Sequence, residues 1–169
     1  MSVLKVLTYP DRFLGRPTKA VENIDGKLQK IIDNMAETMY DAPGAGLAAI
    51  QVGFDKSIIV FDTLPGETEK SLHVLLNPEI LESEGEIISE NEGCLSVPDF
   101  RSDVKRSSIV LVEGIDREGN PIKLEVEGYL AIVLQHEIDH LNDILFINRI
   151  SSLKRELYKR RIKKKLREK

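Results

Sequence analysis

Residues 135–141 read Gln-His-Glu-Ile-Asp-His-Leu, a motif around which we expect the rest of the chain to fold. On a helix, His136 and His140 lie four residues apart on one face, so both imidazoles can reach a single metal ion. Glu137 stands one step round the helix, where a carboxylate suits a general base acting on water better than it suits a metal ligand. The spacing therefore predicts two metal ligands and a base.

The residues around this motif predict that its helix is buried. Residues 129–134 are nonpolar, and Ile138 and Leu141 continue the pattern, so the helix is apolar nearly all round. Two histidines, a glutamate and an aspartate in such a helix need partners, because burying polar groups alone is costly. A histidine pair can also be purely structural, but this setting favours metal binding.

A catalytic metal site with two histidines needs a third protein ligand. The metzincin pattern requires glycine and histidine where this chain has Asp143 and Phe146, which excludes that class. Glu156 is the one arguable downstream donor for a gluzincin-type site. Cys94, the only cysteine, stands upstream within Glu-Gly-Cys-Leu-Ser-Val-Pro at residues 92–98. A lone cysteine is more often a small buried hydrophobe, but the incomplete histidine site makes Cys94 the ligand that we expect.

Three motifs in order resemble those of the peptide deformylases. They are Gly-Ala-Gly-Leu-Ala-Ala-Ile-Gln-Val-Gly at residues 44–53, Glu-Gly-Cys-Leu-Ser at 92–96, and the helix motif at 135–141. The similarity extends from Tyr9 to the basic end of the chain. It implies a cytoplasmic enzyme that removes the N-formyl group from the N-terminal formyl-methionine of newly made polypeptides and releases formate.

The resemblance also implies roles for residues outside the metal site. The Gln51 side-chain amide and the Leu95 backbone N–H would stabilise the oxyanion formed at the formyl carbon. A water-facing Gln51 at a strand edge is the structural alternative. Arg106 would pair with Glu92 and brace the cysteine segment.

The peptide substrate would be held by residues from three segments of the chain. Two glycines flank Ala45 and let the backbone come close to a ligand, so Gly46 belongs to this set. Arg101 would face the peptide, with an ordinary solvated arginine as the alternative. The pocket for the methionine side chain would be lined by Ala45, Tyr129, Ile132 and Val133. Two positions depart from the family pattern, since Ala45 is commonly branched and Asp143 is commonly glycine.

The metal is expected to be one divalent ion. A thiolate with two imidazoles suits Fe(II), Zn(II), Ni(II) and Co(II), and only the resemblance favours Fe(II) in the cell.

We expect an α+β fold, with short antiparallel β-sheets surrounding the buried central helix and a further helix at the C-terminus. Asp25 can cap an earlier helix whose apolar residues, from Leu28 to Met39, follow helical spacing until Pro43 ends it. β-Rich runs follow at residues 57–61, 73–77, 79–89, 107–113 and 121–126. His73 lies in one of these runs and is expected to be exposed, without a ligand role.

Length and composition predict one domain of 169 residues, with 41% hydrophobic content. The catalytic part spans residues 1–150, and residues 151–169 form a basic C-terminal helix within the same domain. No signal peptide and no membrane span are apparent. One cysteine allows no internal disulfide, which fits a reducing cytoplasm.

The C-terminal tail differs in charge from the rest of the chain. Residues 151–169 hold ten Lys or Arg and two Glu, a net charge of +8, so residues 1–150 carry −12 of the overall −4. The tail has a narrow apolar stripe and is expected to contact the RNA of the ribosome, whereas an ordinary solvated helix is the alternative. No membrane or DNA partner is expected.

Two other classes of function remain open from the sequence. A metallopeptidase would use the same helix but would need an extended cleft. A ribosome-binding protein with an inactive site would keep the tail and the metal without turnover.

Overall fold

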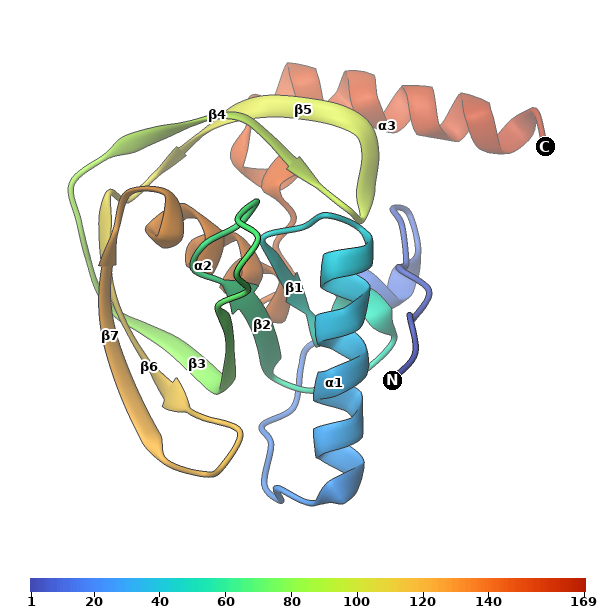
Figure 1. Cartoon of the computed structure of the whole chain (residues 1–169). Helices are drawn as coiled ribbons and strands as arrows, with labels where there is room; N and C mark the ends of the chain where they lie inside the picture. Colours follow the sequence, from blue (N-terminus) through green and yellow to red (C-terminus); the bar gives the residue numbers. More distant parts are fainter.

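The computed structural model describes all residues from 1 to 169 and contains three α-helices, three short 3₁₀-helices and seven strands (Figure 1). In chain order these elements are η1 (Arg12–Gly15), α1 (Gly26–Asp41), β1 (Gly46–Ala48), η2 (Ala49–Val52), β2 (Ile58–Asp62), β3 (Leu72–Glu84), β4 (Ile87–Cys94), β5 (Val97–Arg106), β6 (Ile109–Ile115), β7 (Pro121–Glu127), α2 (Gly128–Leu141), η3 (Phe146–Arg149) and α3 (Ser152–Arg167).

Helix α1 begins where the capping pattern predicts. The Asp25 carboxylate accepts a hydrogen bond from the Leu28 backbone N–H at 2.9 Å, and thereby satisfies one of the amide groups that a helix leaves unpaired at its start. The helix ends at Asp41, two residues before Pro43. Its buried residues face β1 and β2, so the predicted first helix is confirmed.

The strands form two antiparallel sheets that enclose α2. One sheet has the strand order β1-β2-β3-β6-β7, and the other pairs β4 with β5. Figure 1 shows α2 in the interior, with strands on several sides of it. The α+β class with antiparallel sheets around a buried helix is therefore confirmed, although β3, with 13 residues, is longer than the short strands that we expect.

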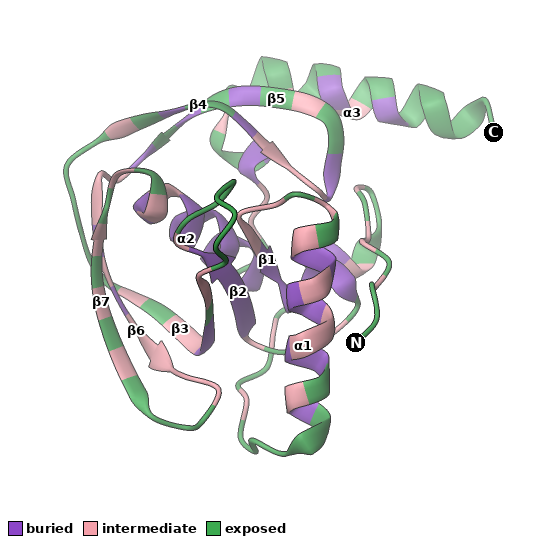
Figure 2. Cartoon of the chain, viewed as in Figure 1, coloured by how far each residue is buried: buried purple, intermediate pink, exposed green.

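Strand β2 packs against α1 with one face and against α2 with the other. Its five residues are all buried, and alternate side chains point to opposite faces. Ile58 and Val60 pack in the cluster beneath α1, whereas Ile59 and Phe61 pack in the cluster beneath α2. Figure 2 shows this buried layer between the helices.

The strand prediction was wrong in three places, the first of which is β1, where no strand was predicted. The run predicted at 79–89 contains the turn between β3 and β4, where Gly85 takes a left-handed conformation. Strand β5 was not predicted, because three of its inward-facing residues are Ser102, Val104 and Arg106, and charged residues alternate with them. An apolar pattern predicts a strand, and β5 lacks this pattern because it turns polar side chains inward.

Helix α3 packs on the body through one narrow stripe. Tyr158 and Ile162 are buried in a cluster with Val97, Val104 and Phe146. Leu153, Leu157 and Leu166 are exposed, and most of the helix is exposed in Figure 2. None of the helices combines the length and the apolar character needed to span a bilayer.

The end of α2 has a strained residue. Asp143 follows the helix with φ +61°, in the left-handed region where a side chain is disfavoured and glycine is not. The Ile144 N–H nearby returns to the Asp139 carbonyl at 2.9 Å and closes the helix end. This conformation explains why glycine is common at this position in the family that the chain resembles.

We predict that Asp143→Gly stabilises the fold by about 0.5–1 kcal/mol, because relief of the left-handed strain exceeds the added backbone entropy of the unfolded chain. Chemical denaturation measures this change. Asn142→Gly is the comparison: Asn142 has φ −109° and its side chain donates to the Ile138 carbonyl at 3.2 Å, so glycine there should destabilise the fold. Destabilisation by both substitutions would show that the Asp143 side chain contributes more than its conformation costs.

Candidate metal centre and active site

Three donor atoms converge between β4 and α2. Cys94 ends β4, His136 and His140 lie on α2, and the ligand atoms of all three lie within 4.8 Å of one another. The Cys94 Sγ is 3.3 Å from the His140 Nε2. Ligands bound about 2.3 Å (sulfur) and about 2.1 Å (nitrogen) from one tetrahedral ion lie roughly 3.6 Å apart. The spacing and the donor types therefore fit one divalent metal ion.

The surroundings of the two imidazoles also fit this use. Burial lowers the pKa of His136, but hydrogen bonds to Cys94 and Glu92 outweigh it and hold the pKa well above its usual value, so a metal ion must displace a proton from this ring. The His136 Nδ1 lies 2.7 Å from a Glu92 carboxylate oxygen, and a proton on Nδ1 leaves Nε2 with its lone pair. Burial, together with the neighbouring charge of His136, keeps the pKa of His140 well below its usual value. A neutral His140 ring can bind a metal.

Glu92 and Arg106 form the buried pair that the resemblance implies. Arg106 donates from Nε and Nη2 to the two oxygens of Glu92. Burial alone would raise the pKa of Glu92, but hydrogen bonds from His136 and Arg106 outweigh it and bring the pKa to about 2. Glu92 therefore stays ionised, and it holds the His136 ring.

Glu137 is a buried carboxyl group with unused hydrogen-bonding capacity. Its Oε2 is buried without a hydrogen-bond partner in the chain. Burial raises the pKa of Glu137 to about 7, against the opposing charge of His136. A group with this pKa can accept and return a proton near neutral pH.

Gly46 makes room for that carboxyl group. A Cβ atom at Gly46 would lie 2.8 Å from the Glu137 Cγ and 2.9 Å from its Oε1. Contacts this short require Glu137 to move. The sequence predicts Gly46 as a residue that lets the backbone approach a ligand, and the structure adds that its missing side chain leaves space for the Glu137 carboxyl group.

Gln51 is buried rather than water-facing. Its Oε1 accepts a hydrogen bond from the Ala48 N–H at 2.9 Å, which fixes the orientation of the amide. Its Nε2 donates to the Ser96 hydroxyl at 3.2 Å and lies 3.6 Å from the Cys94 Sγ. Sequence reasoning missed the contact with Ser96, although Ser96 lies within the cysteine motif.

A cavity of about 880 Å³ opens beside these groups. Arg101 and Tyr129 lie on its exposed rim, and Arg101 donates to the Asn91 carbonyl at 3.1 Å. His140 does not line the cavity. The predicted site residues on its wall are Ala45, Gly46, Gln51, Cys94, Leu95, Arg101, Tyr129, Ile132, Val133, His136 and Glu137.

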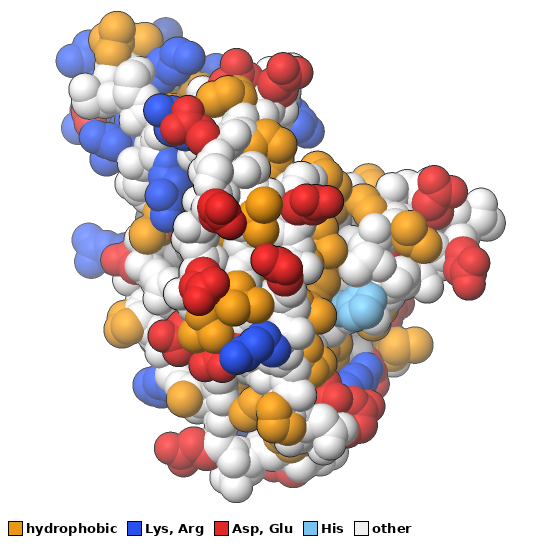
Figure 3. Space-filling model, turned by 90° about the vertical axis from the view of Figure 1, so that its left-hand side faces the viewer, with side chains coloured by type: hydrophobic (Ala, Val, Ile, Leu, Met, Phe, Trp, Pro, Cys, Tyr) orange, Lys and Arg blue, Asp and Glu red, His pale blue; other side chains and the backbone are white.

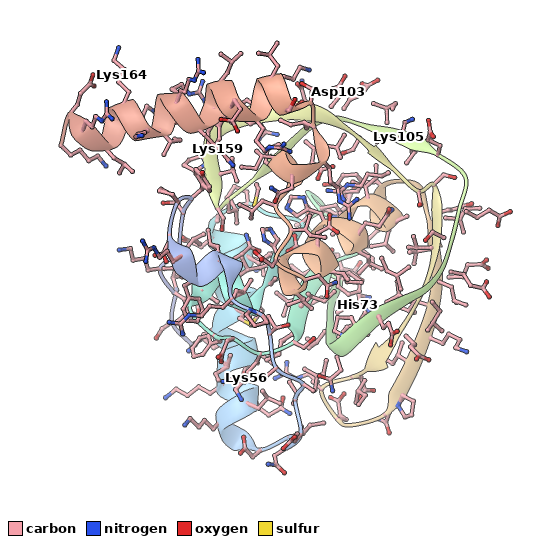
Figure 4. All side chains as sticks on the ribbon, turned by 180° about the vertical axis from the view of Figure 1, so that it is seen from behind. Lys56, His73, Asp103, Lys105, Lys159 and Lys164 are labelled. Carbon is pink, nitrogen blue, oxygen red and sulfur yellow. The ribbon has the colours of Figure 1, made fainter.

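The cavity also has lining residues that the sequence analysis did not single out. They include Glu90, Asn91 and Phe100, which flank the cysteine segment on β4 and β5. The unpredicted β5 is the reason, because only the pairing of the two strands brings Phe100 to the wall. His73 lies on β3, is exposed and stacks on Phe61, so its expected exposure is confirmed (Figure 4).

The family model described as polypeptide deformylase matches residues 3–156. The chain belongs to this family. The peptide deformylase of Thermodesulfovibrio yellowstonii is 54% identical over 165 residues, covering 98% of this chain and 99% of that protein. The peptide deformylase of Desulfosudis oleivorans is 51% identical over 168 residues, covering 99% and 97%.

Solved structures of deformylases have the same fold. A crystal structure of a peptide deformylase from Legionella pneumophila has a TM-score of 0.89 at 44% identity and covers 98% of this chain and 96% of that one. The Ehrlichia chaffeensis deformylase in complex with actinonin has a TM-score of 0.89 at 38% identity, with 98% of each chain covered. Deformylases are metal-dependent hydrolases, so membership in the family removes the metallopeptidase alternative.

We predict that Gly46→Ala lowers kcat about 100-fold, because a displacement of the base by about 1 Å is enough for such a loss. Formate release from a formyl-methionyl peptide measures it. Gly26→Ala is the matched control, since a Cβ there meets nothing within 4 Å, and it should keep full activity. Full activity of Gly46→Ala would show that Glu137 can work from a shifted position.

Proposed function

We propose that this chain hydrolyses the formyl amide of N-formylmethionyl peptides, with Glu137 as the proton carrier of the reaction. The observation that supports this proposal most is the buried, unpaired Glu137 oxygen on a cavity wall beside three convergent metal-ligand atoms. Membership in the deformylase family supplies the reaction class.

Cys94, His136 and His140 would hold one divalent metal ion. When bound, such an ion acidifies water and polarises the formyl carbonyl. We propose Fe(II) as the ion in the cell on the strength of the family resemblance, and the same donors accept Zn(II), Ni(II) and Co(II).

Glu137 would take the proton from the attacking water. Its pKa of about 7 before any metal charge is counted lets the carboxylate form accept a proton at neutral pH. The protonated Glu137 would then donate to the nitrogen of the leaving amine, so that formate and a free N-terminus result. One residue thereby serves as base and acid in turn.

Two N–H groups are available for the developing oxyanion. Gln51 Nε2 carries two hydrogens, of which one is directed to the Ser96 hydroxyl and the other to the Cys94 sulfur at 3.6 Å; sulfur is a weak acceptor, so this second N–H can exchange it for an oxyanion. The Leu95 backbone N–H has no acceptor within the chain. Both groups line the cavity, and we assign them to stabilising the oxyanion.

The methionine side chain and the peptide would occupy the rest of the cavity. Tyr129, Ile132 and Val133 come from the first part of α2 and supply apolar surface, with Ala45 opposite them in the lining. Arg101 stands at the exposed rim, where its guanidinium can donate to peptide carbonyls. The small Ala45 side chain would leave this pocket wider than a branched residue would.

We predict that Glu137→Gln lowers formate release by about 10²–10⁴-fold, because the amide keeps the shape of the side chain but cannot take up a proton and return it near neutral pH. Formate release and metal content, both measured on protein purified without oxygen, test the role of the residue and the identity of the metal. The variant should retain its metal. Glu90→Gln is the matched control, since Glu90 is an exposed carboxylate on the same cavity and should be dispensable. Activity of Glu137→Gln within threefold of wild type would overturn the assignment of the base.

We further propose that α3 belongs to the same domain as residues 1–150 and binds the ribosome, which places the enzyme in the cytoplasm. Tyr158 and Ile162 join α3 to the body, and Arg161 donates to the Asp99 carbonyl at 2.8 Å. The outward face of α3 is basic, and Figure 4 shows Lys159 and Lys164 on this helix. In Figure 3 many Lys and Arg side chains gather at one end of the molecule, whereas Asp and Glu are spread over the rest of that face.

We predict that neutralising four exposed cations of α3 weakens ribosome binding at least tenfold and flattens its salt dependence, because fewer counterions are released. Hydrolysis of a short formyl peptide should not change. Co-sedimentation with ribosomes at several salt concentrations measures the effect. The variant is Lys154→Gln, Arg160→Gln, Lys163→Gln and Lys164→Gln, and its control on the body is Lys27→Gln, Lys30→Gln, Lys56→Gln and Lys123→Gln. Equal binding by the two variants would contradict the role of α3.

A further inference from the structure

A line of buried hydrogen-bonded charges leads from the metal site to the start of the C-terminal segment. His136 contacts Glu92 at 2.7 Å, and Glu92 pairs with Arg106. Arg106 Nη1 donates to Asp139 at 2.7 Å, and Asp139 also accepts from Arg149. Apart from the metal ligand His136, the proposed mechanism assigns no role to this line.

Asp139 is the junction of the line. It lies on α2 between the two histidines, is buried, and accepts three hydrogen bonds on its two oxygens. Arg149 supplies two of them, from Nε at 2.6 Å and from Nη2 at 2.7 Å. This is the paired arrangement in which a guanidinium fixes a carboxylate in one orientation.

Arg149 lies at the outer end of this line and close to the start of α3. It ends η3, two residues before Ser151, whose side chain caps α3. Its side chain is 41% exposed, whereas Arg106 is almost fully buried. At the other end of η3, the Phe146 ring stacks near the His136 ring, with centroids 6.3 Å apart. The segment that connects α2 to α3 therefore contacts the ligand His136 directly and also through Asp139.

We propose that Arg149 is a positioning residue that sets the affinity of the metal site and ties it to the placement of the C-terminal segment. The inference rests on the proposed metal site at Cys94, His136 and His140. With Arg149 in place, Asp139 is fixed and holds one edge of Arg106, so the other edge of Arg106 faces Glu92. Glu92 then holds the His136 ring with its Nε2 toward the other ligands. Without Arg149, the buried carboxylate of Asp139 keeps Arg106 as its single cationic partner, and both of these side chains are free to turn.

The test is the affinity of the Arg149→Met protein for Co(II), measured by competition with a chelator in full-length protein. We expect binding about tenfold weaker than in wild type, because partners that orient metal ligands contribute 10–100-fold to affinity. The visible spectrum of the Co(II) protein should shift, and kcat should fall with KM unchanged. Arg149→Lys should lose nearly as much affinity, since an ammonium group cannot make the paired contact.

Arg161→Met is the control for a purely structural effect. Arg161 also anchors the C-terminal segment, through the Asp99 carbonyl and the rings of Phe100 and Tyr158, but it makes no contact with the line of charges. We expect a lower melting temperature of the metal-free protein with unchanged Co(II) affinity. Co(II) affinity of Arg149→Met within twofold of wild type, with a similar loss of melting temperature, would overturn the proposal. A wild-type protein that binds no Co(II) would instead overturn the metal site itself, and the coupling with it.

Discussion

The structure depends on the cost of burying charge in α2. His136, Glu137, Asp139 and His140 are all buried in one helix whose other buried residues, apart from Gln135, are apolar. Each of these groups requires a partner that water would otherwise supply. The surrounding elements supply them, with Cys94 from β4, Glu92 and Arg106 from the β4–β5 pair, and Arg149 from η3.

Glu137 differs most from the other three groups, and the proposed mechanism uses it. His136 and Asp139 have hydrogen-bonded partners, and His140 contacts the Cys94 sulfur through Nε2 while its Nδ1 has no partner. One oxygen of Glu137 also has no partner, and burial raises the pKa of its carboxyl group to about 7. Gly46 keeps a space open for this group at the cavity wall. A fully hydrogen-bonded carboxylate at the same place would have a lower pKa and would be a weaker base toward water.

Sequence reasoning reached the parts of this protein that depend on local spacing. Helix α1 with its Asp25 cap, the buried α2, and the set of Cys94, His136 and His140 all follow from short patterns, and the structure brings the three donor atoms together. Strand β5 could not be predicted from an apolar pattern because its inward face is partly polar. The pairing of Asp139 with Arg149 could not be predicted from the sequence either. Many charged residues are available along the chain, and only the tertiary fold decides which of them meet.

The length of α3 separates the residues that contribute to folding from those that determine its attraction to a polyanion. Its 16 residues extend roughly 24 Å, about three Debye lengths at physiological salt. Because Tyr158 and Ile162 are its buried contacts, the charges of its last turns, apart from Lys165, which pairs with Asp99 at 3.5 Å, are screened from most of the acidic body. Substitutions in those turns therefore change the attraction to a polyanion with little effect on folding. The number of Lys and Arg residues in those turns can therefore change during evolution without affecting the site on α2. The residues of that site are constrained more strictly, because they must keep their buried partners.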